Sequence, residues 1–221
     1  MDYYYLRKDY NYKTVDYSQK TDWESIICAK NTDHQRAGQR IGDLMIDRVP
    51  KNVGNFIWTT LLGELLIDDK IANLFEKNNI SGYTLKPVTI DKNDKNYKLW
   101  EFVVTGWAGV ASEKSGIKLK SSCDYCGDIT YTSFKNPKYL IDENRWDGSD
   151  FFMVWPLPRY KFISSKVARI IKEENLKGSI ISLVEDIEVD NSVIDNLSPG
   201  RLSMYMPAKR AKVLGEPLGI Y

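Results

Sequence analysis

The segment from Ile67 to Val88 occurs a second time, without a gap, from Ile163 to Val184. The two copies read IDDKIANLFEKNNISGYTLKPV and ISSKVARIIKEENLKGSIISLV, and many of their differences exchange one apolar residue for another. Because the same positions stay apolar, both copies are expected to bury the same face. The sequence therefore predicts one supersecondary unit that is used twice.

Each copy contains the signals for the start of a helix. Asp68 and Ser164 are good N-cap residues, whose side-chain oxygens can accept the first free backbone N–H groups. The apolar residues that follow are spaced at i, i+3 and i+4, up to Phe75 in one copy and Ile171 in the other. This spacing places them on a single helical face.

The end of each helix is marked by an asparagine. Asn79 and Asn175 suit the left-handed position just beyond a helix, and the next residue, Ile80 or Leu176, can pack back on the last turn. The segments beyond Gly82 and Gly178 alternate apolar and polar residues and are rich in β-branched side chains, as strands are. The predicted unit is a cap, a helix, an asparagine stop and a strand.

A glycine turn and an aromatic-rich strand precede each copy, at 54–58 and 148–154. The polar segment 91–98 is predicted to be an exposed loop between two halves, 1–95 and 96–221. We therefore expect an α+β fold of two pseudo-repeated strand-helix-strand halves with mainly antiparallel sheet. The tyrosine-rich segment 1–20 suits an edge strand or hairpin, and Pro207 to Leu214 suits a short helix stopped by Gly215.

The net charge of +1 over 221 residues provides no global field that would attract nucleic acid or an anionic membrane. The N-terminus lacks the apolar core of an export signal, and no stretch approaches the ~20 apolar residues of a membrane span. These features favour a cytoplasmic protein that makes no membrane contact.

Cys123-Asp-Tyr-Cys126-Gly127 has the form of a zinc knuckle, in which two thiolates can grip one ion. A tetrahedral zinc needs four ligands, and the remaining soft ligands of the chain are Cys28 and its one histidine, His34. The spacing between Cys28 and His34 is irregular. The sequence leaves two outcomes open: a degenerate knuckle without metal, or one structural zinc held by these four residues.

The sequence contains little that matches the motifs of known catalytic sites. A redox C-x-x-C begins a helix, whereas a strand-like run follows Cys126. A Ser-His-Asp or Cys-His constellation would have to use His34, and no nucleophile motif accompanies it. We therefore expect a protein that is not an enzyme. A small hydrolase that uses Cys123 or His34 is the enzymatic alternative, and it requires activity that Cys123→Ala removes.

Two surface features are candidates for partner binding. Trp146, in the turn Arg145-Trp-Asp-Gly-Ser-Asp150, can either cap the core or stand exposed as an interface anchor. The second is a run of acidic residues, which is either a binding surface or an ordinary solvated face. It consists of Glu185, Asp186, Glu188 and Asp190.

The order of CDYCG, WDGSDFF and FISSKVARIIKEENLKGSIISLV resembles bacterial immunity proteins of polymorphic toxin systems, namely the double-CXXCG type and the related immunity family eleven. The resemblance covers about residues 120–185 and reaches 28–90 mainly through the internal repeat. The first C-x-x-C-G of the family is reduced here to Cys28 followed by AKNTDH.

The resemblance implies a non-enzymatic cytosolic protein that binds and neutralises a cognate toxin protein. The competing hypothesis is a zinc-ribbon-like adaptor that binds nucleic acid, with a basic patch at Lys209, Arg210 and Lys212. Neither hypothesis fixes the oligomeric state.

Overall fold

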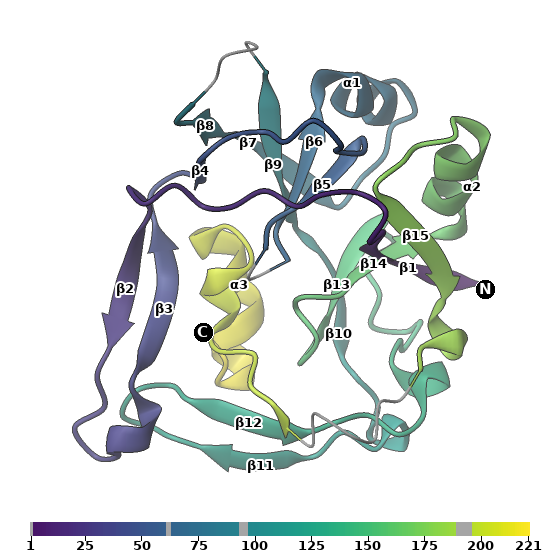
Figure 1. Cartoon of the computed structure of the whole chain (residues 1–221). Helices are drawn as coiled ribbons and strands as arrows, with labels where there is room; N and C mark the ends of the chain where they lie inside the picture. The colour runs from purple at the N-terminus through teal and green to yellow at the C-terminus, as the bar shows by residue number, and fades with distance from the viewer. Residues whose placement is uncertain (1, 61–62, 93–96, 189–195) are drawn as a thin grey trace.

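The computed structural model describes residues 2–60, 63–92, 97–188 and 196–221. Two larger sheets and three smaller ones account for the strands of these residues, and three α-helices accompany them (Figure 1). Most ladders are antiparallel, and the parallel pairs are β10 with β13 and β4 with β8. The α+β class and the mainly antiparallel pairing are thus confirmed.

The five-stranded sheet has the order β10 (Gly106–Val110), β13 (Phe151–Trp155), β14 (Lys161–Ser164), β1 (Tyr3–Lys8), β15 (Ser179–Leu183). The four-stranded sheet has the order β5 (Phe56–Trp58), β6 (Leu65–Asp68), β9 (Leu99–Val104), β7 (Tyr83–Pro87). The smaller sheets are β11 (Leu119–Ser122) with β12 (Ile129–Thr132) and β16 (Asn196–Leu197), β2 (Asp22–Ile26) with β3 (Arg36–Ile41), and β4 (Met45–Ile46) with β8 (Thr89–Ile90).

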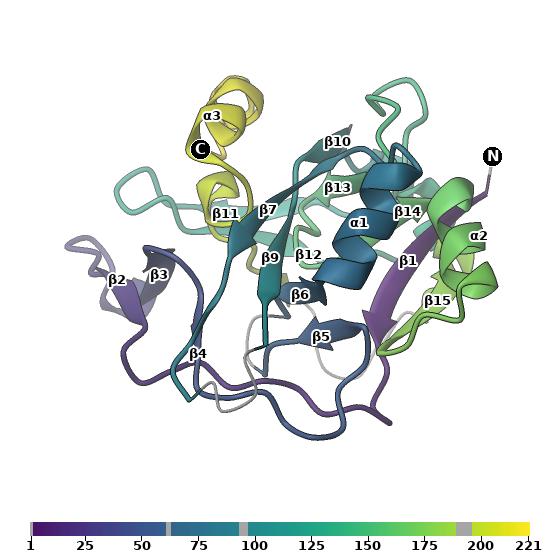
Figure 2. The same cartoon turned by 90° about the horizontal axis from the view of Figure 1, so that it is seen from above.

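The helices α1 (Asp69–Lys77) and α2 (Ser165–Glu173) occupy the same place in the two repeat copies and lie side by side in both views (Figure 2). Asp68 accepts a hydrogen bond from the N–H of Ile71, and Ser164 accepts one from Val167, as N-caps do. The predicted caps are therefore correct.

The predicted helix stops are also present. Asn79 and Asn175 have φ angles of 50° and 51°. The N–H of Ile80 donates to the carbonyl of Phe75 at 3.0 Å, five residues back, and Leu176 N–H donates to the carbonyl of Ile171 at the same distance. This backbone pairing is a Schellman motif, and the residue after the asparagine is buried in both copies.

The strand pairing has the same register in both units. Each unit has one strand before its helix and one after it, and a third strand lies between these two. A single residue of the third strand pairs with one residue of each neighbour. The pairs are Ile67 and Pro87 with Trp100 in the four-stranded sheet, and Ile163 and Leu183 with Tyr4 in the five-stranded sheet. In the first unit the third strand is β9, which follows the unit in sequence. In the second unit it is β1, near the N-terminus.

This pairing corrects the expectation for the N-terminal segment. β1 is not an edge strand, because it lies between β14 and β15 and pairs with both. Among the described residues, no strand that follows the second unit takes the place that β9 has in the first unit. The N-terminal strand fills that place and satisfies both rows of backbone hydrogen bonds.

The two units contact each other reciprocally through the backbone. Phe56 N–H donates to the carbonyl of Lys177 at 2.9 Å, and Phe151 N–H donates to the carbonyl of Ser81 at 3.0 Å. In the repeat, Lys177 and Ser81 are equivalent positions just after the helix stop. Each unit thus anchors the first strand of the other.

Hydrogen bonds to side chains connect the two units in the same reciprocal way. Lys177 N–H donates to Oδ1 of Asn55 at 2.9 Å, and Ser81 N–H donates to Oδ2 of Asp150 at 3.1 Å. Asn55 and Asp150 both immediately precede the strand that their unit contributes to this contact. The reciprocity indicates a local pseudo-two-fold relation, while the equivalence of the two whole halves stays a prediction.

The main hydrophobic core contains residues from both 1–95 and 96–221, including Phe75, Phe102, Phe151 and Ile171. The boundary expected between residues 95 and 96 lies outside the described residues. The helix predicted in the tail is α3 (Ala208–Gly215), and its buried residue Ala211 belongs to the same core. The predicted stop at Gly215 is wrong, because this residue keeps a right-handed φ of −91° inside the helix and Glu216 is the C-cap. Within the described chain, every helix is too short or too polar for a bilayer-spanning segment.

Candidate metal centre

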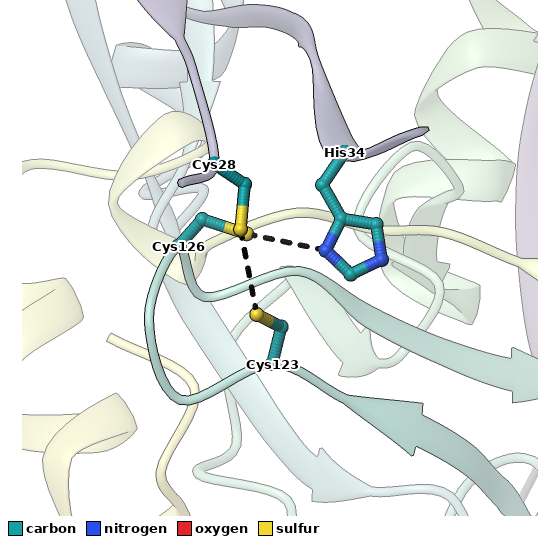
Figure 3. Close-up of side chains that lie close together, drawn as sticks. All are labelled: Cys28, His34, Cys123 and Cys126. Carbon is teal, nitrogen blue, oxygen red and sulfur yellow. Dashed lines mark hydrogen bonds between the residues drawn. The ribbon is translucent and has the colours of Figure 1, made fainter. Parts of the chain in front are cut away.

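Two hairpins that are distant in sequence carry the candidate metal ligands. Cys28 and His34 lie in the connection between β2 and β3, and Cys123 and Cys126 lie in the turn between β11 and β12. The ligand atoms of all four residues lie within 4.8 Å of one another (Figure 3). The structure therefore brings together the complete set that the sequence singled out.

Two edges of this cluster have the lengths of a zinc tetrahedron. Sγ of Cys28 is 3.8 Å from Sγ of Cys123, and Sγ of Cys126 is 3.5 Å from Nδ1 of His34. Zinc bonds of about 2.3 Å to sulfur and 2.0 Å to nitrogen give tetrahedral edges of about 3.8 and 3.5 Å. The remaining edges, at most 4.8 Å, need to shorten by no more than about 1.0 Å between two sulfurs and about 1.3 Å between sulfur and nitrogen.

The turn between β11 and β12 is shaped to present thiolates. Gly127 has a φ of +68°, and its N–H donates to the carbonyl of Cys123 at 2.8 Å. The backbone N–H groups of Cys126 and Tyr125 point at the Cys123 sulfur and lower the pKa of that thiol to about 6. The donors of the turn thus favour the thiolate form that a metal requires.

Burial has the opposite effect on the second cysteine of the turn. Removal from water raises the pKa of the Cys126 thiol, and the backbone N–H of Asp128 partly opposes that rise. Cys126 and Cys28 are both buried. A nearby cation would offset the cost of placing these sulfurs as thiolates inside the protein.

His34 is held by residues of its own loop and of the opposite hairpin. Nδ2 of Asn31 lies 3.0 Å from Nε2, and Oδ2 of Asp128 lies 3.7 Å from the same nitrogen. When Nδ1 binds a metal, Nε2 carries a proton, which the Asn31 Nδ2 group cannot accept and the Asp128 carboxylate can. Asp128 also lies 2.8 Å from the Arg36 guanidinium, which fixes its position.

The sequence did not indicate these supporting residues. Asp128 and Arg36 belong to different hairpins, and only the folded arrangement brings both next to the ligand cluster. Arg201, from the C-terminal part, donates to the carbonyl of Cys126 at 3.1 Å and holds the turn from a third direction. A charged residue next to a C-x-x-C-G turn was the available signal for Asp128.

The described partner-binding candidates lie outside the two hairpins that carry the ligands. Trp146 is half-buried, packs edge-on against Tyr3 with ring centroids 5.3 Å apart, and donates Nε1–H to the carbonyl of Ser149. Trp146 also packs on Phe152, with centroids 5.6 Å apart. These contacts favour its interpretation as a residue that caps the core.

Three members of the acidic run, Glu185, Asp186 and Glu188, are exposed at and beyond the short 3-10 turn Val184–Asp186. Asp190 lies outside the described residues. The basic residues of the tail are partly engaged, because Arg210 contacts Asp147 at 2.8 Å and Lys212 lies 3.5 Å from Glu216.

Comparison with protein-family models and with curated protein sequences finds no match to this chain.

Proposed function

We propose that Cys28, His34, Cys123 and Cys126 hold one structural zinc ion that fastens the β2–β3 hairpin to the β11–β12 hairpin. The observation that carries this proposal is the clustering of four soft ligand atoms with two edges of tetrahedral length. Four protein ligands leave no open position for water or substrate, which is typical of structural and not of catalytic zinc.

Metal analysis of the purified protein tests the zinc proposal. About one zinc per chain is expected, and a chelator should lower the melting temperature because metal binding is coupled to folding. Cys123→Ser should lose the metal and the chelator effect together. Asp124→Asn, in the same turn, is the matched control and should retain both. Protein that contains no zinc and does not take it up with stabilisation contradicts the proposal.

We further propose that the chain is a non-enzymatic binding protein that neutralises a cognate bacterial toxin. The support is the resemblance of CDYCG and WDGSDFF to immunity proteins, together with a closed ligand set that offers no catalytic position. In that role the zinc would hold the two hairpins rigid, and a preformed surface lowers the entropic cost of binding.

Co-expression tests the neutralisation. The chain should restore growth to cells that express the toxin domain encoded by the adjacent upstream gene. Charge reversal at Glu185, Asp186 and Glu188 is expected to weaken protection without lowering stability, because exposed charges act mainly on association. Reversal at Glu173 and Glu174, exposed acids at the end of α2, is the control. Failure to bind or protect against that toxin domain refutes this assignment, whatever the metal content.

The nucleic-acid alternative predicts a different result. A zinc-ribbon-like adaptor would bind DNA or RNA with an affinity that falls steeply as salt rises. The ion pairs of Arg210 and Lys212 with acidic neighbours reduce the positive charge that this patch can offer. Binding that weakens with salt and is lost on neutralising Lys209 and Arg210 would favour the alternative.

A further inference from the structure

A cavity of about 330 Å³ lies between β3, β9, β14 and the start of α3. These elements can be followed in Figure 1. None of the four candidate metal ligands lines this space. Its volume falls in the range of small-molecule sites. We call it the charged cavity, after the residues of its wall.

Much of the wall is apolar, and the residues come from distant parts of the chain. Phe102, Met153, Pro158, Met204 and Met206 all line it. Methionine is flexible and polarizable, so it adapts to ligands of different shape. A ligand that fills this part of the cavity should therefore carry an apolar group.

Three charged side chains line the same space and are at least nine-tenths buried. The side chain of Arg40 is 8% exposed, and residues Glu101 and Lys161 are 6% and 9% exposed. Arg40 donates from Nη2 to Oε1 of Glu101 at 2.5 Å and from Nη1 to the carbonyl of Gly42 at 2.7 Å. Burial of charge is costly unless each charged atom is paired.

The pairing among these groups is incomplete within the described residues. Oε2 of Glu101 is buried without a hydrogen-bond partner. Lys161 Nζ, which has three protons to donate, makes one hydrogen bond, to the carbonyl of Arg159 at 3.2 Å. The wall of the cavity therefore contains an unmatched carboxylate oxygen, which its neighbours cover, and an ammonium group with unused donors.

A second pair of charges accompanies this set. Glu64 lines the cavity and lies with its Oε1 3.5 Å from Nε of Arg40, and Arg159 lies at the exposed rim. Lys86 also lines the cavity, so with all six groups ionised the wall holds four positive and two negative charges. A simple anion would meet two carboxylates, and a simple cation would meet four positive groups. A ligand that carries one positive and one negative group can pair with both kinds of charged side chain in the wall.

We propose that the charged cavity binds a free α-amino acid with an apolar side chain. Its carboxylate accepts hydrogen bonds from Lys161 and lies near Arg159, and its ammonium group donates to the unpaired oxygen of Glu101. Its side chain packs among the methionines and Phe102. This site is independent of both the zinc and the toxin proposals.

Calorimetric titration of the full-length protein tests the site with L-methionine, L-leucine and L-phenylalanine as probes. Isovalerate, which lacks the ammonium group, and isopentylamine, which lacks the carboxylate, are the matched ligands. We expect saturable binding of at least one amino acid, and binding at least about tenfold weaker for each truncated compound, since a hydrogen bond to a charged group is lost.

Two variants assign the binding to this cavity. Lys161→Met keeps the length of the side chain and removes its charge, and Glu101→Gln keeps the shape of the carboxylate. Each should weaken amino-acid binding at least about tenfold, whereas Lys51→Met, at an exposed position, should leave it unchanged. The comparison of ligands on the unaltered protein remains decisive if a variant does not fold.

Three results would overturn the proposal. One is the absence of binding for all three amino acids at millimolar concentration. Another is equal binding of isovalerate or isopentylamine. The third is unchanged binding in folded Lys161→Met.

Discussion

Substitution of Gly82 or Gly178 by alanine tests the reciprocal contact of the two repeat units. Gly82 has a φ of +85°, and a Cβ atom built on it would lie 1.9 Å from the carbonyl oxygen of Phe151. Gly178 has a φ of +96°, and its Cβ would lie 2.0 Å from the carbonyl oxygen of Phe56. Both atoms in the way belong to the backbone, so the units must move apart.

The expected cost has two parts. An alanine in the left-handed region costs about 1 to 2 kcal/mol. The displacement in Gly82→Ala also strains the hydrogen bonds Phe151 N–H to Ser81 O and Ser81 N–H to Asp150 Oδ2. Each contributes about 0.5 to 1.5 kcal/mol, and more when the partner is charged. We therefore expect a loss of roughly 3 to 6 kcal/mol in the free energy of unfolding.

Gly148→Ala separates the two parts of this cost. Gly148 has a φ of +82°, and a Cβ there meets no atom within 4 Å. This control should therefore lose only the conformational part, about 1 to 2 kcal/mol. Urea unfolding followed by tryptophan fluorescence provides the measurement. A cost for Gly82→Ala no larger than that for Gly148→Ala would show that the contact does not constrain the units, and tolerance of Gly178→Ala but not of Gly82→Ala would show that it is not reciprocal.

Four further substitutions have defined outcomes. Phe75→Ala and Ile171→Ala should each cost about 2 to 5 kcal/mol in urea unfolding, because both side chains are buried behind their helix stops; a cost near zero at either would show that the stop does not bury it. Burial lowers the pKa of Lys161 from 10.5 to about 8, so the unfolded chain binds more protons above pH 8 and stability should rise by about 1 to 2 kcal/mol between pH 8 and 9.5. Lys161→Met should remove that rise, and an unchanged slope in the variant would assign it to other groups. Trp146→Ala should cost about 3 kcal/mol if the side chain caps the core, whereas lost toxin binding at full stability would indicate an interface anchor.

The sequence by itself determined the local structure of the repeat unit. Caps at Asp68 and Ser164, the apolar helix face and the stops at Asn79 and Asn175 are all short-range signals, because each depends on residues within about one or two helical turns. The strands on either side follow from alternation and β-branched composition. For the same reason the sequence identified the C-x-x-C-G turn and the tail helix.

Local signals could not place strands that pair over long distances. The tyrosines of β1 are consistent with any half-buried strand, and only tertiary structure inserts it between β14 and β15. The position depends on which backbone groups remain unpaired once the second unit has formed. The reciprocal contacts at Gly82 and Gly178 were hidden for a similar reason, since a glycine after a helix has a sufficient local explanation.

The candidate metal centre was also predicted in part from the sequence and decided in part by the tertiary structure. Residue chemistry limited the ligands to the cysteines and the one histidine, because few other side chains in this chain favour zinc. Whether Cys28 and Cys123 meet depends on the packing of two hairpins, and their sulfurs lie 3.8 Å apart only in the folded chain. The charged cavity was beyond sequence reasoning, because Arg40, Glu101 and Lys161 belong to three strands that no local pattern connects.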